Sequence, residues 1–304
     1  MRRRTRWFIV SFLAPASILY AMFIIYPFLS SVRYSLYNWT GIGPLKDFIG
    51  LKNYAYALFS SDFAGQFWRA MLHNVYFFVL TIFLVSVCGL GIAYFLTRVK
   101  ERYAQWLEVI YFLPMVIPPI VVAYLWAMYL EPNQGTIPAF LSALHLNFLN
   151  IPFLGEARSA LPTIAVITVW ATLGYSVFIF IPAINNIPIE MFEAARVDGA
   201  GSIRIFFSIV FRMIMPTYLT ICTLVFISAF GIFDYVFILE SQYGGPNYAT
   251  DVLSTLFFRI AFGTMNGQSG GLGLASALAV IGFVVVMIAS SILVVFQKRA
   301  SRDL

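Results

Sequence analysis

The residue types that most often do chemistry in proteins are few in this 304-residue sequence, and they stand apart. The two cysteines, Cys88 and Cys222, lie inside apolar runs, where cysteine behaves as a small hydrophobic residue. The two histidines, His73 and His145, have no cysteine or acidic residue nearby at metal-ligand spacing. The sequence therefore predicts neither a disulfide nor a metal site, which argues against a metalloenzyme.

Phosphate chemistry would need a Gly-rich loop that ends in Gly-Lys-Ser or Gly-Lys-Thr, because the lysine reaches the phosphates and the hydroxyl holds magnesium. The lysines of this chain follow Leu, Leu, Val and Gln: Lys46, Lys52, Lys100 and Lys298. None of them completes that motif. We therefore predict that the chain is not an enzyme, has no catalytic residue and no cofactor of its own, and leaves any ATP and magnesium to a separate subunit.

Composition places the chain in a lipid bilayer. Hydrophobic residues make up 61% and charged residues 11%, whereas a soluble domain has roughly 25% charged residues. The formal net charge of +6 would be compatible with a nucleic-acid partner. However, the positive residues lie at the ends of apolar runs and do not cluster on a soluble surface, so no nucleic-acid partner is expected.

Six apolar stretches without Asp, Glu, Lys, Arg or His are long enough to cross a membrane, which takes about 20 residues. They lie near residues 7–29, 75–96, 109–130, 161–184, 213–233 and 271–296. Backbone polar groups in lipid must be satisfied within the segment, so runs of this length predict helices. We expect an all-α integral membrane protein with six transmembrane helices in a single domain, residues 1–304, with outer loops near 30–72, 131–160 and 236–270.

Charge predicts the orientation of these spans. Six spans leave both termini on one side, and both termini are basic: Arg2, Arg3, Arg4 and Arg6 at the start, Lys298, Arg299 and Arg302 at the end. By the positive-inside rule this side faces the cytoplasm. The first stretch follows a basic start as a signal peptide would, but its length and the lack of a small-x-small cleavage site predict a retained anchor. We expect a multi-pass protein of the cell (inner or plasma) membrane with both termini cytoplasmic.

The loop between the fourth and fifth spans, residues 185–212, is amphipathic and too charged to cross the membrane. Its charged residues recur at helical intervals: Glu190, Glu193, Arg196, Asp198, Arg204 and Arg212. Asp198-Gly199 interrupts the pattern, so we expect two short helices that meet at Gly199. Helices this short are marginal alone. They need a partner surface or the bundle, and an interfacial helix pair on the inner leaflet fits the pattern equally well.

The same loop resembles the EAA loop of binding-protein-dependent ABC importers, in which Glu-Ala-Ala precedes Asp-Gly-Ala and, later, Phe, Ile and Pro. The matching residues are Glu193, Ala194, Ala195, Asp198, Gly199, Ala200, Phe206, Ile209 and Pro216. In that family the loop docks on the nucleotide-binding subunit. The resemblance therefore implies that six residues couple this chain to an ATPase: Glu193, Ala194, Ala195, Asp198, Gly199 and Ala200. Gly199 would be a turn that a side chain obstructs. Arg212 departs from the pattern, since a proline is usual there, which bears on how the second short helix joins span five.

Three further segments resemble the sugar-uptake branch of these importers, specifically the maltose-type permease subunit. They are Phe48-Ile-Gly-Leu-Lys-Asn-Tyr54, the region Pro114 to Gly135, and Tyr243-Gly-Gly-Pro246 followed by Thr250. Each alone can be read as a turn or an interface element, but their order around the EAA loop favours the resemblance. It implies a type I ABC importer permease bundle that translocates a sugar, an oligosaccharide or a related glycerol phosphate compound.

Sugar recognition inside a bundle needs aromatic faces against C–H surfaces and a few hydrogen-bonding groups aimed at hydroxyls. Counted back from the EAA loop, Trp170 and Tyr175 resemble a tryptophan and a sugar-contacting tyrosine of the maltose-type subunit, and Thr172 lies between them. Gly231 stands where that family often has an asparagine, and we interpret the following Asp234 as a helix-end or gate residue. The candidate substrate-binding residues are Trp170, Thr172, Tyr175 and Gly231. A tyrosine such as Tyr175 can equally pack the bundle.

The resemblance also implies partners: a second permease subunit in a heterodimer, a dimer of ATP-binding cassette ATPases and an extracytoplasmic solute-binding protein, besides the lipid bilayer. A secondary carrier driven by an ion gradient is a second hypothesis, but such carriers usually have ionisable residues within their spans. A third is a structural membrane protein, in which small residues would be packing positions: Gly271, Gly273, Ala275, Ala277 and Ala279. Permeases for amino acids, polyamines or metals share the EAA loop, so only the outer-loop resemblances indicate sugar.

Overall fold

The computed structural model describes residues 2–263 and 271–302, with side chains from Val10 onward. Within this part of the chain there is no β-strand, only an isolated antiparallel bridge between Tyr37 and Phe48. The all-helical class predicted from the sequence is confirmed. Of the expected outer loop 236–270, residues 264–270 lie outside the described residues, and so do the side chains of the N-terminal arginines.

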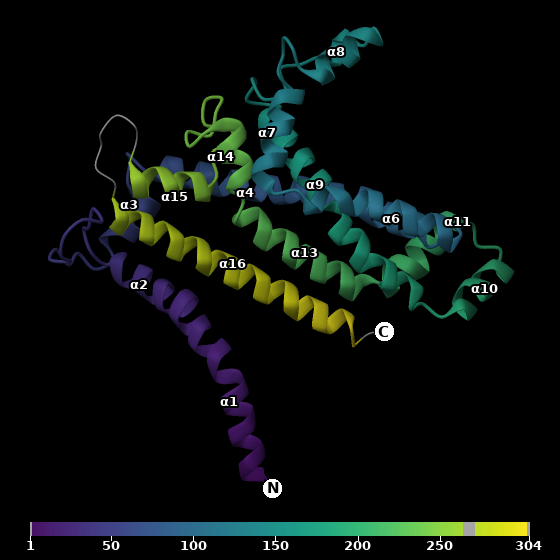
Figure 1. The fold of residues 1–304 in the computed structure, drawn as a ribbon, viewed down its shortest axis with the longest axis horizontal. Helices are drawn as coiled ribbons and strands as arrows, with labels where there is room; N and C mark the ends of the chain where they lie inside the picture. The colour runs from purple at the N-terminus through teal and green to yellow at the C-terminus, as the bar shows by residue number, and fades with distance from the viewer. Residues whose placement is uncertain (1, 264–270, 303–304) are drawn as a thin grey trace. The chain divides into compact units, whose positions relative to one another are not determined.

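The helices follow one another along the chain as drawn in Figure 1. They are α1 (Arg2–Tyr20), α2 (Tyr26–Tyr34), α3 (Lys52–Phe59), α4 (Ala64–Leu84), α5 (Leu90–Leu96), α6 (Glu101–Val116), α7 (Pro119–Tyr129), α8 (Thr136–Ala143), α9 (Ala160–Asn185), α10 (Ile189–Val197), α11 (Ser202–Ile205), α12 (Phe211–Met213), α13 (Met215–Phe230), α14 (Asp234–Glu240), α15 (Leu253–Phe262) and α16 (Leu272–Ala300). Five-residue π-helical turns connect consecutive helices at Ala21–Ile25, Val85–Gly89 and Phe206–Val210, and a 3-10 turn forms at Asn147–Leu149.

Four continuous helical runs are long and apolar enough to cross a membrane: Val10–Tyr34, Ala64–Leu96, Ala160–Asn185 and Leu272–Ala300. Two further helix pairs are long and apolar enough only when the two helices of a pair are counted together, because each pair is bent at a short break. α6 and α7 meet at 96°, and Ser202–Met213 meets α13 at 71°. If each bent pair is one span, the described residues hold six, the number predicted from the sequence. The sequence analysis did not predict that the third and fifth spans would be broken.

Proline explains the first break. α6 ends at Val116, and Ile117 is extended, with φ −78° and ψ 128°. The residue before a proline is driven out of the helical region by a clash with the proline ring, and Ile117 precedes Pro118. α7 then begins at Pro119, a position where the missing N–H would have no helical partner in any case.

The second break shows how the loop that resembles an EAA loop joins the fifth span. Ile214 leaves the helical path with φ −90° and ψ 4°, and α13 starts at Met215 with Pro216 in its first turn. Arg212 lies in the three-residue α12 just before this break. Pro216 marks the start of the new helix. The bend therefore forms even though Arg212 stands where the family that this loop resembles usually has a proline.

The chain groups into two compact units, which we describe separately: residues 1–68 with 257–284, and residues 69–256 with 285–304. In the first unit, the segment Phe48–Tyr54 joins the end of α2 to α3. Asn53 Nδ2 donates to the carbonyl oxygens of Ser35, at 2.8 Å, and Tyr37, at 3.0 Å. The Tyr54 hydroxyl lies 2.6 Å from Ser35 Oγ. The residues of this segment that resemble a sugar permease thus include Asn53 and Tyr54, whose side chains hold the C-terminal end of α2 in place.

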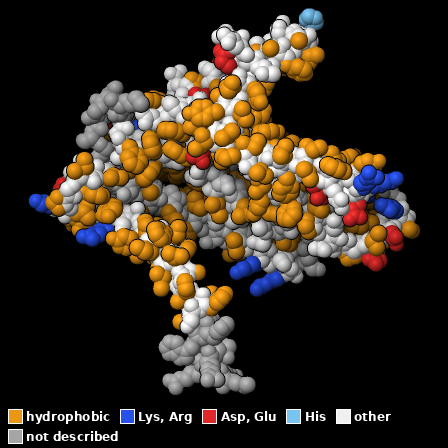
Figure 2. Space-filling model, in the orientation of Figure 1, with side chains coloured by type: hydrophobic (Ala, Val, Ile, Leu, Met, Phe, Trp, Pro, Cys, Tyr) orange, Lys and Arg blue, Asp and Glu red, His pale blue; other side chains and the backbone are white. Residues whose placement is uncertain are grey.

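The second unit is built around α9, which contacts α5, α6, α7, α13 and α14. Gly174 lets α6 approach α9 closely, since a Cβ at this position would lie 2.5 Å from the carbonyl oxygen of Tyr111. Phe77 of α4 and Phe180 of α9 are fully buried in the two apolar clusters of this unit. Figure 2 shows hydrophobic side chains along the length of α6 and α9 and charged side chains gathered at the end that carries α10 and α11.

Candidate functional site

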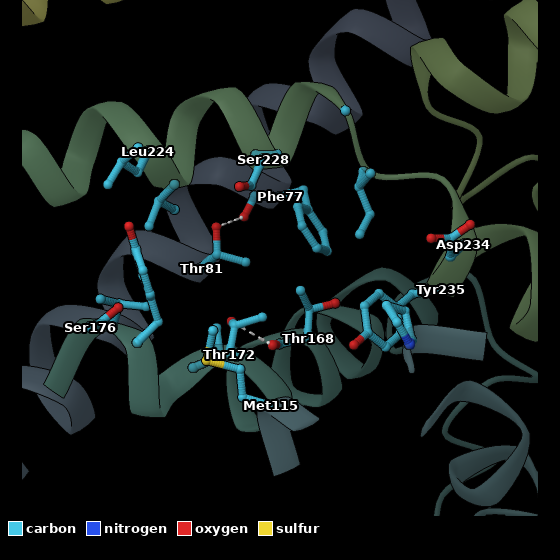
Figure 3. Close-up of a pocket in the computed structure, with 18 of the residues that line it drawn as sticks. Phe77, Thr81, Met115, Thr168, Thr172, Ser176, Leu224, Ser228, Asp234 and Tyr235 are labelled. Carbon is cyan, nitrogen blue, oxygen red and sulfur yellow. Dashed lines mark hydrogen bonds between the residues drawn. The ribbon is translucent and has the colours of Figure 1, made fainter. Parts of the chain in front are cut away.

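A cavity of about 440 Å³ lies within the second unit, bordered by α4, α9 and α13 (Figure 3). Its size is within the range of small-molecule sites. Each helix contributes one face, because the lining residues recur every three or four positions. They are Phe77 and Thr81 of α4, with Val85 of the π-helical turn that follows it; Thr168, Val169, Thr172, Tyr175 and Ser176 of α9; and Leu224, Val225, Ser228 and Ala229 of α13.

Two of the breaks between helices in this unit reach the cavity wall. Met115 and Pro119 flank the break between α6 and α7, and Gly231 to Phe233 form the break between α13 and α14. Non-helical backbone at membrane depth is tolerated where it is buried in protein or lines a cavity. The positions of these two breaks therefore fit a bundle in which non-helical backbone lines a cavity.

Hydroxyl groups dominate the polar part of this wall. Three threonines of α4 and α9 each donate to the carbonyl oxygen four residues earlier: Thr81 to Phe77, Thr168 to Ile164 and Thr172 to Thr168, all at 2.8 Å. Figure 3 draws two of these bonds. Tyr175, Ser176, Ser228 and Tyr235 add further hydroxyls, and Asp234 adds a carboxylate. The rings of Phe77, Tyr175 and Tyr235 supply the aromatic surface that a sugar site requires.

Three of the four candidate substrate-binding residues line this cavity: Tyr175, Thr172 and Gly231. Trp170 lies outside the wall, and its indole packs edge-on against Trp126 with ring centroids 5.5 Å apart. Asp234, interpreted from sequence as a helix-end or gate residue, is the first residue of α14 and also lines the cavity. The structure thus brings three of the predicted residues together, and their contact with a substrate stays a prediction.

Sequence reasoning missed most of the other hydroxyls in the wall. A usable signal was present in the fourth span, where Thr168, Thr172 and Ser176 stand four residues apart among apolar neighbours. That spacing places all three on one helix face. Thr81 and Ser228 gave no such signal. Thr81 is the one Ser or Thr of α4, and Ser228 falls outside the three-residue spacing of Thr217, Thr220 and Thr223 in α13, so only tertiary packing brings the two to the wall.

Asn74 fixes the end of the wall formed by α13. Its side chain is fully buried, its Nδ2 donates to the Ala229 carbonyl at 2.7 Å, and its Oδ1 accepts from the Leu253 N–H at 2.9 Å. The Ser254 hydroxyl donates to the carbonyl oxygen of Ile232. These bonds satisfy carbonyl groups that the break between α13 and α14 would otherwise leave without partners. The sequence analysis did not single out Asn74, a buried amide just before an apolar span.

The loop that resembles an EAA loop folds as two short helices joined near Gly199, as predicted. The Gly199 N–H donates to the Arg196 carbonyl at 3.0 Å, and the Ala200 N–H donates to the Ala195 carbonyl at 2.9 Å. This pair of bonds is a Schellman motif, with Gly199 in the left-handed region at φ +74°. A Cβ on Gly199 would meet nothing within 4 Å. Within this chain, glycine is therefore required by backbone conformation and not by lack of space.

The motif residues of this loop face outward. Glu193, Ala194, Asp198 and Gly199 are exposed. Large apolar side chains around them are exposed as well: Ile189, Val197, Ile203 and Phe207, with Val197 at 87% and Ile203 at 76%. Exposed apolar residues rimmed by charged ones are typical of a protein–protein contact. We call this set of eight residues the coupling surface, after the role that the family resemblance predicts for this loop.

Comparison with known proteins gives consistent results. The family model of the binding-protein-dependent transport system inner membrane component matches residues 85–302, which include the coupling surface and all the cavity-lining residues except Phe77 and Thr81. The probable ABC transporter permease protein YurN of Bacillus subtilis (strain 168) is 31% identical over 293 residues, 96% of each chain. The diacetylchitobiose uptake system permease protein NgcF of Streptomyces coelicolor is 29% identical over 287 residues, 91% of this chain and 80% of NgcF.

The fold is also similar to a solved structure. A chain of a bacterial ABC transporter that imports the acidic polysaccharide alginate superposes with a TM-score of 0.77 at 21% identity. The match covers 99% of this chain and 97% of the other. At this identity the likeness shows the fold alone.

Proposed function

We propose that this chain, which belongs to the family of binding-protein-dependent transport system inner membrane components, forms one half of a transmembrane pathway for a sugar or oligosaccharide. The observation that carries the proposal is the cavity, about 440 Å³ in volume, in which hydroxyl groups and aromatic rings from α4, α9 and α14 face one space. Sugars offer both hydroxyls and apolar C–H faces, so this combination of groups suits them. NgcF, named as a diacetylchitobiose permease, supports the same substrate class.

A second permease subunit completes the pathway in this proposal. Tyr175 and Thr172 line the cavity and are both exposed, as is Gly231. A translocation site in a membrane must be closed to lipid, because its polar groups would lose their hydrogen-bond partners there. A partner chain of the same fold packed over this open side would close it, and a heterodimer would allow the two halves to carry different side chains.

ATP drives the cycle from a separate subunit in this proposal. The chain has no lysine that completes a phosphate-binding loop, whereas the coupling surface offers exposed apolar side chains to a partner. We therefore assign the coupling surface to the contact with a dimer of ATP-binding cassette ATPases, with ATP and magnesium bound there. The positive-inside rule then puts both termini in the cytoplasm and the segment 236–263 outside, where a solute-binding protein delivers the sugar.

Reconstitution of the complex tests the proposal. The full chain is co-expressed with its second permease subunit and ATPases, purified and placed in proteoliposomes with the solute-binding protein. The panel contains neutral and acidic sugars, and we expect at least one of them to stimulate ATP hydrolysis and to accumulate inside the vesicles. We expect Glu193→Lys, on the coupling surface, to abolish ATPase association or transport without unfolding the chain. If no ATPase co-purifies and Glu193→Lys leaves transport unchanged, the importer assignment fails.

A further inference from the structure

We propose that the cavity takes sugars that carry hydroxyl donors and no negative charge, and that it rejects anionic substrates such as uronates and phosphate esters. The inference rests on the proposed function and deepens it by fixing the electrostatic class of the substrate. Two independent observations carry it: the direction of the hydrogen bonds made by the wall, and the sign of its charge.

The threonines of the wall present acceptors to the cavity. A hydroxyl group has one proton to donate and two lone pairs to accept with. Thr81, Thr168 and Thr172 each use the proton on a backbone carbonyl of their own helix, at 2.8 Å. Their oxygen atoms therefore remain as acceptors on two helices that border the same space (Figure 3). A ligand satisfies such atoms only by donating hydrogen bonds to them.

The charge of the wall has one sign. Among the described residues that line the cavity, Asp234 is charged and no Lys, Arg or His is present. The remaining polar groups are the hydroxyls of Tyr175, Ser176, Ser228 and Tyr235, whose protons can rotate toward a ligand. Charges interact more strongly in a cavity poor in water than in bulk solvent. An anionic ligand would therefore meet repulsion from Asp234, and no cation among the described wall residues of this chain would balance its charge.

The two observations exclude the same ligands. An ionised carboxylate or phosphate group is a pure acceptor, so it cannot satisfy the threonine oxygens. A buried polar group without a partner carries a desolvation penalty, so the threonine oxygens that face the anionic group would be destabilised. Sugar hydroxyls donate to the threonines and to Asp234, while ring and glycosidic oxygens accept from Tyr175 or Ser228. The wall is thus complementary to a polyol and mismatched to an anion.

The test measures binding to the membrane complex without the solute-binding protein, whose own selectivity would otherwise dominate. The full complex in lipid nanodiscs is titrated with matched pairs that differ by one carboxylate: methyl glucoside with methyl glucuronide, and cellobiose with cellobiouronic acid, plus sn-glycerol-3-phosphate. Saturation-transfer NMR reports each Kd. We expect the neutral member of a pair to bind at least about tenfold more tightly. Asp234→Asn should improve uronate binding and so bring the ratio of the acidic to the neutral Kd to within about threefold. Asp62→Asn is a matched change at an exposed site, and it should leave this ratio unchanged.

Each outcome bears on the inference. Tighter binding of the neutral sugars, with a smaller difference in Asp234→Asn, supports the inference. If this variant does not fold, the Kd ratios measured for the unaltered chain still test the inference. Equal or tighter binding of the uronates or of glycerol phosphate overturns the inference and leaves the proposed sugar pathway intact. If no carbohydrate binds, neutral or acidic, the proposed function fails and the inference fails with it.

Discussion

The guanidinium carbon of Arg98 lies 5.5 Å from the centroid of the Phe192 ring. It also lies 4.8 Å from the ring centroid of Tyr94, and Arg98 Nη2 donates to the Tyr94 hydroxyl at 2.8 Å. Tyr94 belongs to α5 and Phe192 to α10. One arginine thus joins the helix that carries Glu193 to a helix of the bundle. We therefore expect a displacement of α10 to reach α5 through this contact.

Replacement of Arg98 tests this joint. We expect Arg98→Gln to remove cation–π contacts worth ~0.5–2 kcal/mol and to lower sugar-stimulated ATP hydrolysis of the reconstituted complex several-fold, because α10 is then less firmly held. Basal hydrolysis and the yield of folded complex should change little. Arg102→Gln is the matched control, since Arg102 is an equally exposed arginine of α6, whereas the ring contacts at Tyr94 and Phe192 belong to Arg98. If both variants keep the full stimulation, the Arg98–Phe192 contact does not transmit force.

The Schellman turn at Gly199 predicts a graded series of substitutions. A left-handed backbone costs an ordinary residue about 1–2 kcal/mol, while asparagine tolerates it better. With φ at +74° and free space around the Cα, we expect Gly199→Asn to retain most ATP-driven uptake, Gly199→Ala to lose part of it and Gly199→Val to lose most. Uptake into proteoliposomes measures the order. If alanine and valine are equally harmful and asparagine is too, a partner surface must exclude any side chain at this position.

Much of this arrangement follows from local sequence signals. The apolar stretches predicted helices because a backbone in lipid must satisfy its own hydrogen bonds. The Asp198-Gly199 interruption predicted the turn between α10 and α11, because glycine is the residue that readily adopts a positive φ. Pro118 and Pro119 carried the signal for the break after α6, although the sequence analysis treated residues 109–130 as one span.

The cavity was less accessible from the sequence. Tyr175 and Thr172 were found through a family resemblance, and Trp170, chosen by the same reasoning, lies outside the wall. Their helix is apolar around nearly its whole circumference, so apolar periodicity does not tell which face borders a cavity, and only the spacing of Thr168, Thr172 and Ser176 marks one face. The side of α9 that meets Thr81 and Ser228 is decided by contacts between segments distant in the chain. No local pattern encodes those contacts.

The close approach of α6 to α9 predicts a difference between two glycines in the bundle. A Cβ at Gly174 would lie 2.5 Å from the carbonyl oxygen of Tyr111, whereas one at Gly91 would meet nothing within 4 Å. Gly174→Ala should therefore force the helices apart and destabilise the chain by about 1–3 kcal/mol. Gly91→Ala should leave stability equal or slightly higher, because alanine favours helix more than glycine. Thermal unfolding in detergent compares the two, and equal Tm values would contradict the packing.

Glu240 predicts a dependence of stability on pH. It ends α14, Oε1 is buried without a hydrogen-bond partner, and Oε2 lies close to Gly245 of the Gly-Gly-Pro turn. Burial raises the pKa of this carboxyl from 4.5 to about 7. The folded chain therefore holds the proton more tightly than the unfolded chain. Stability should fall as pH rises from about 4.5 to about 7, and should level off above that range.

Glu240→Gln isolates this effect, since glutamine cannot ionise. We expect the Tm of the variant to be close to that of the unaltered chain at pH 4.5 and to exceed it by a growing margin up to pH 7. Glu156→Gln, at an exposed site, controls for the loss of a carboxylate in general. A difference in Tm that stays constant across this pH range, or that shrinks as pH rises, would show that Glu240 is not the titrating group.

Tyr175 is the candidate substrate residue that can be tested most directly, because its ring lines the cavity and is 43% exposed. Tyr175→Ala removes both the ring and the hydroxyl, and we expect sugar uptake to fall at least about tenfold. Tyr175→Phe removes only the hydroxyl, whose hydrogen bond is worth about 0.5–1.5 kcal/mol, so a smaller loss should follow. Tyr124→Ala, an exposed tyrosine of α7 outside the wall, is the control. Co-purification with the ATPase should be unchanged in all three, and unaltered uptake kinetics in Tyr175→Ala would remove this residue from the site.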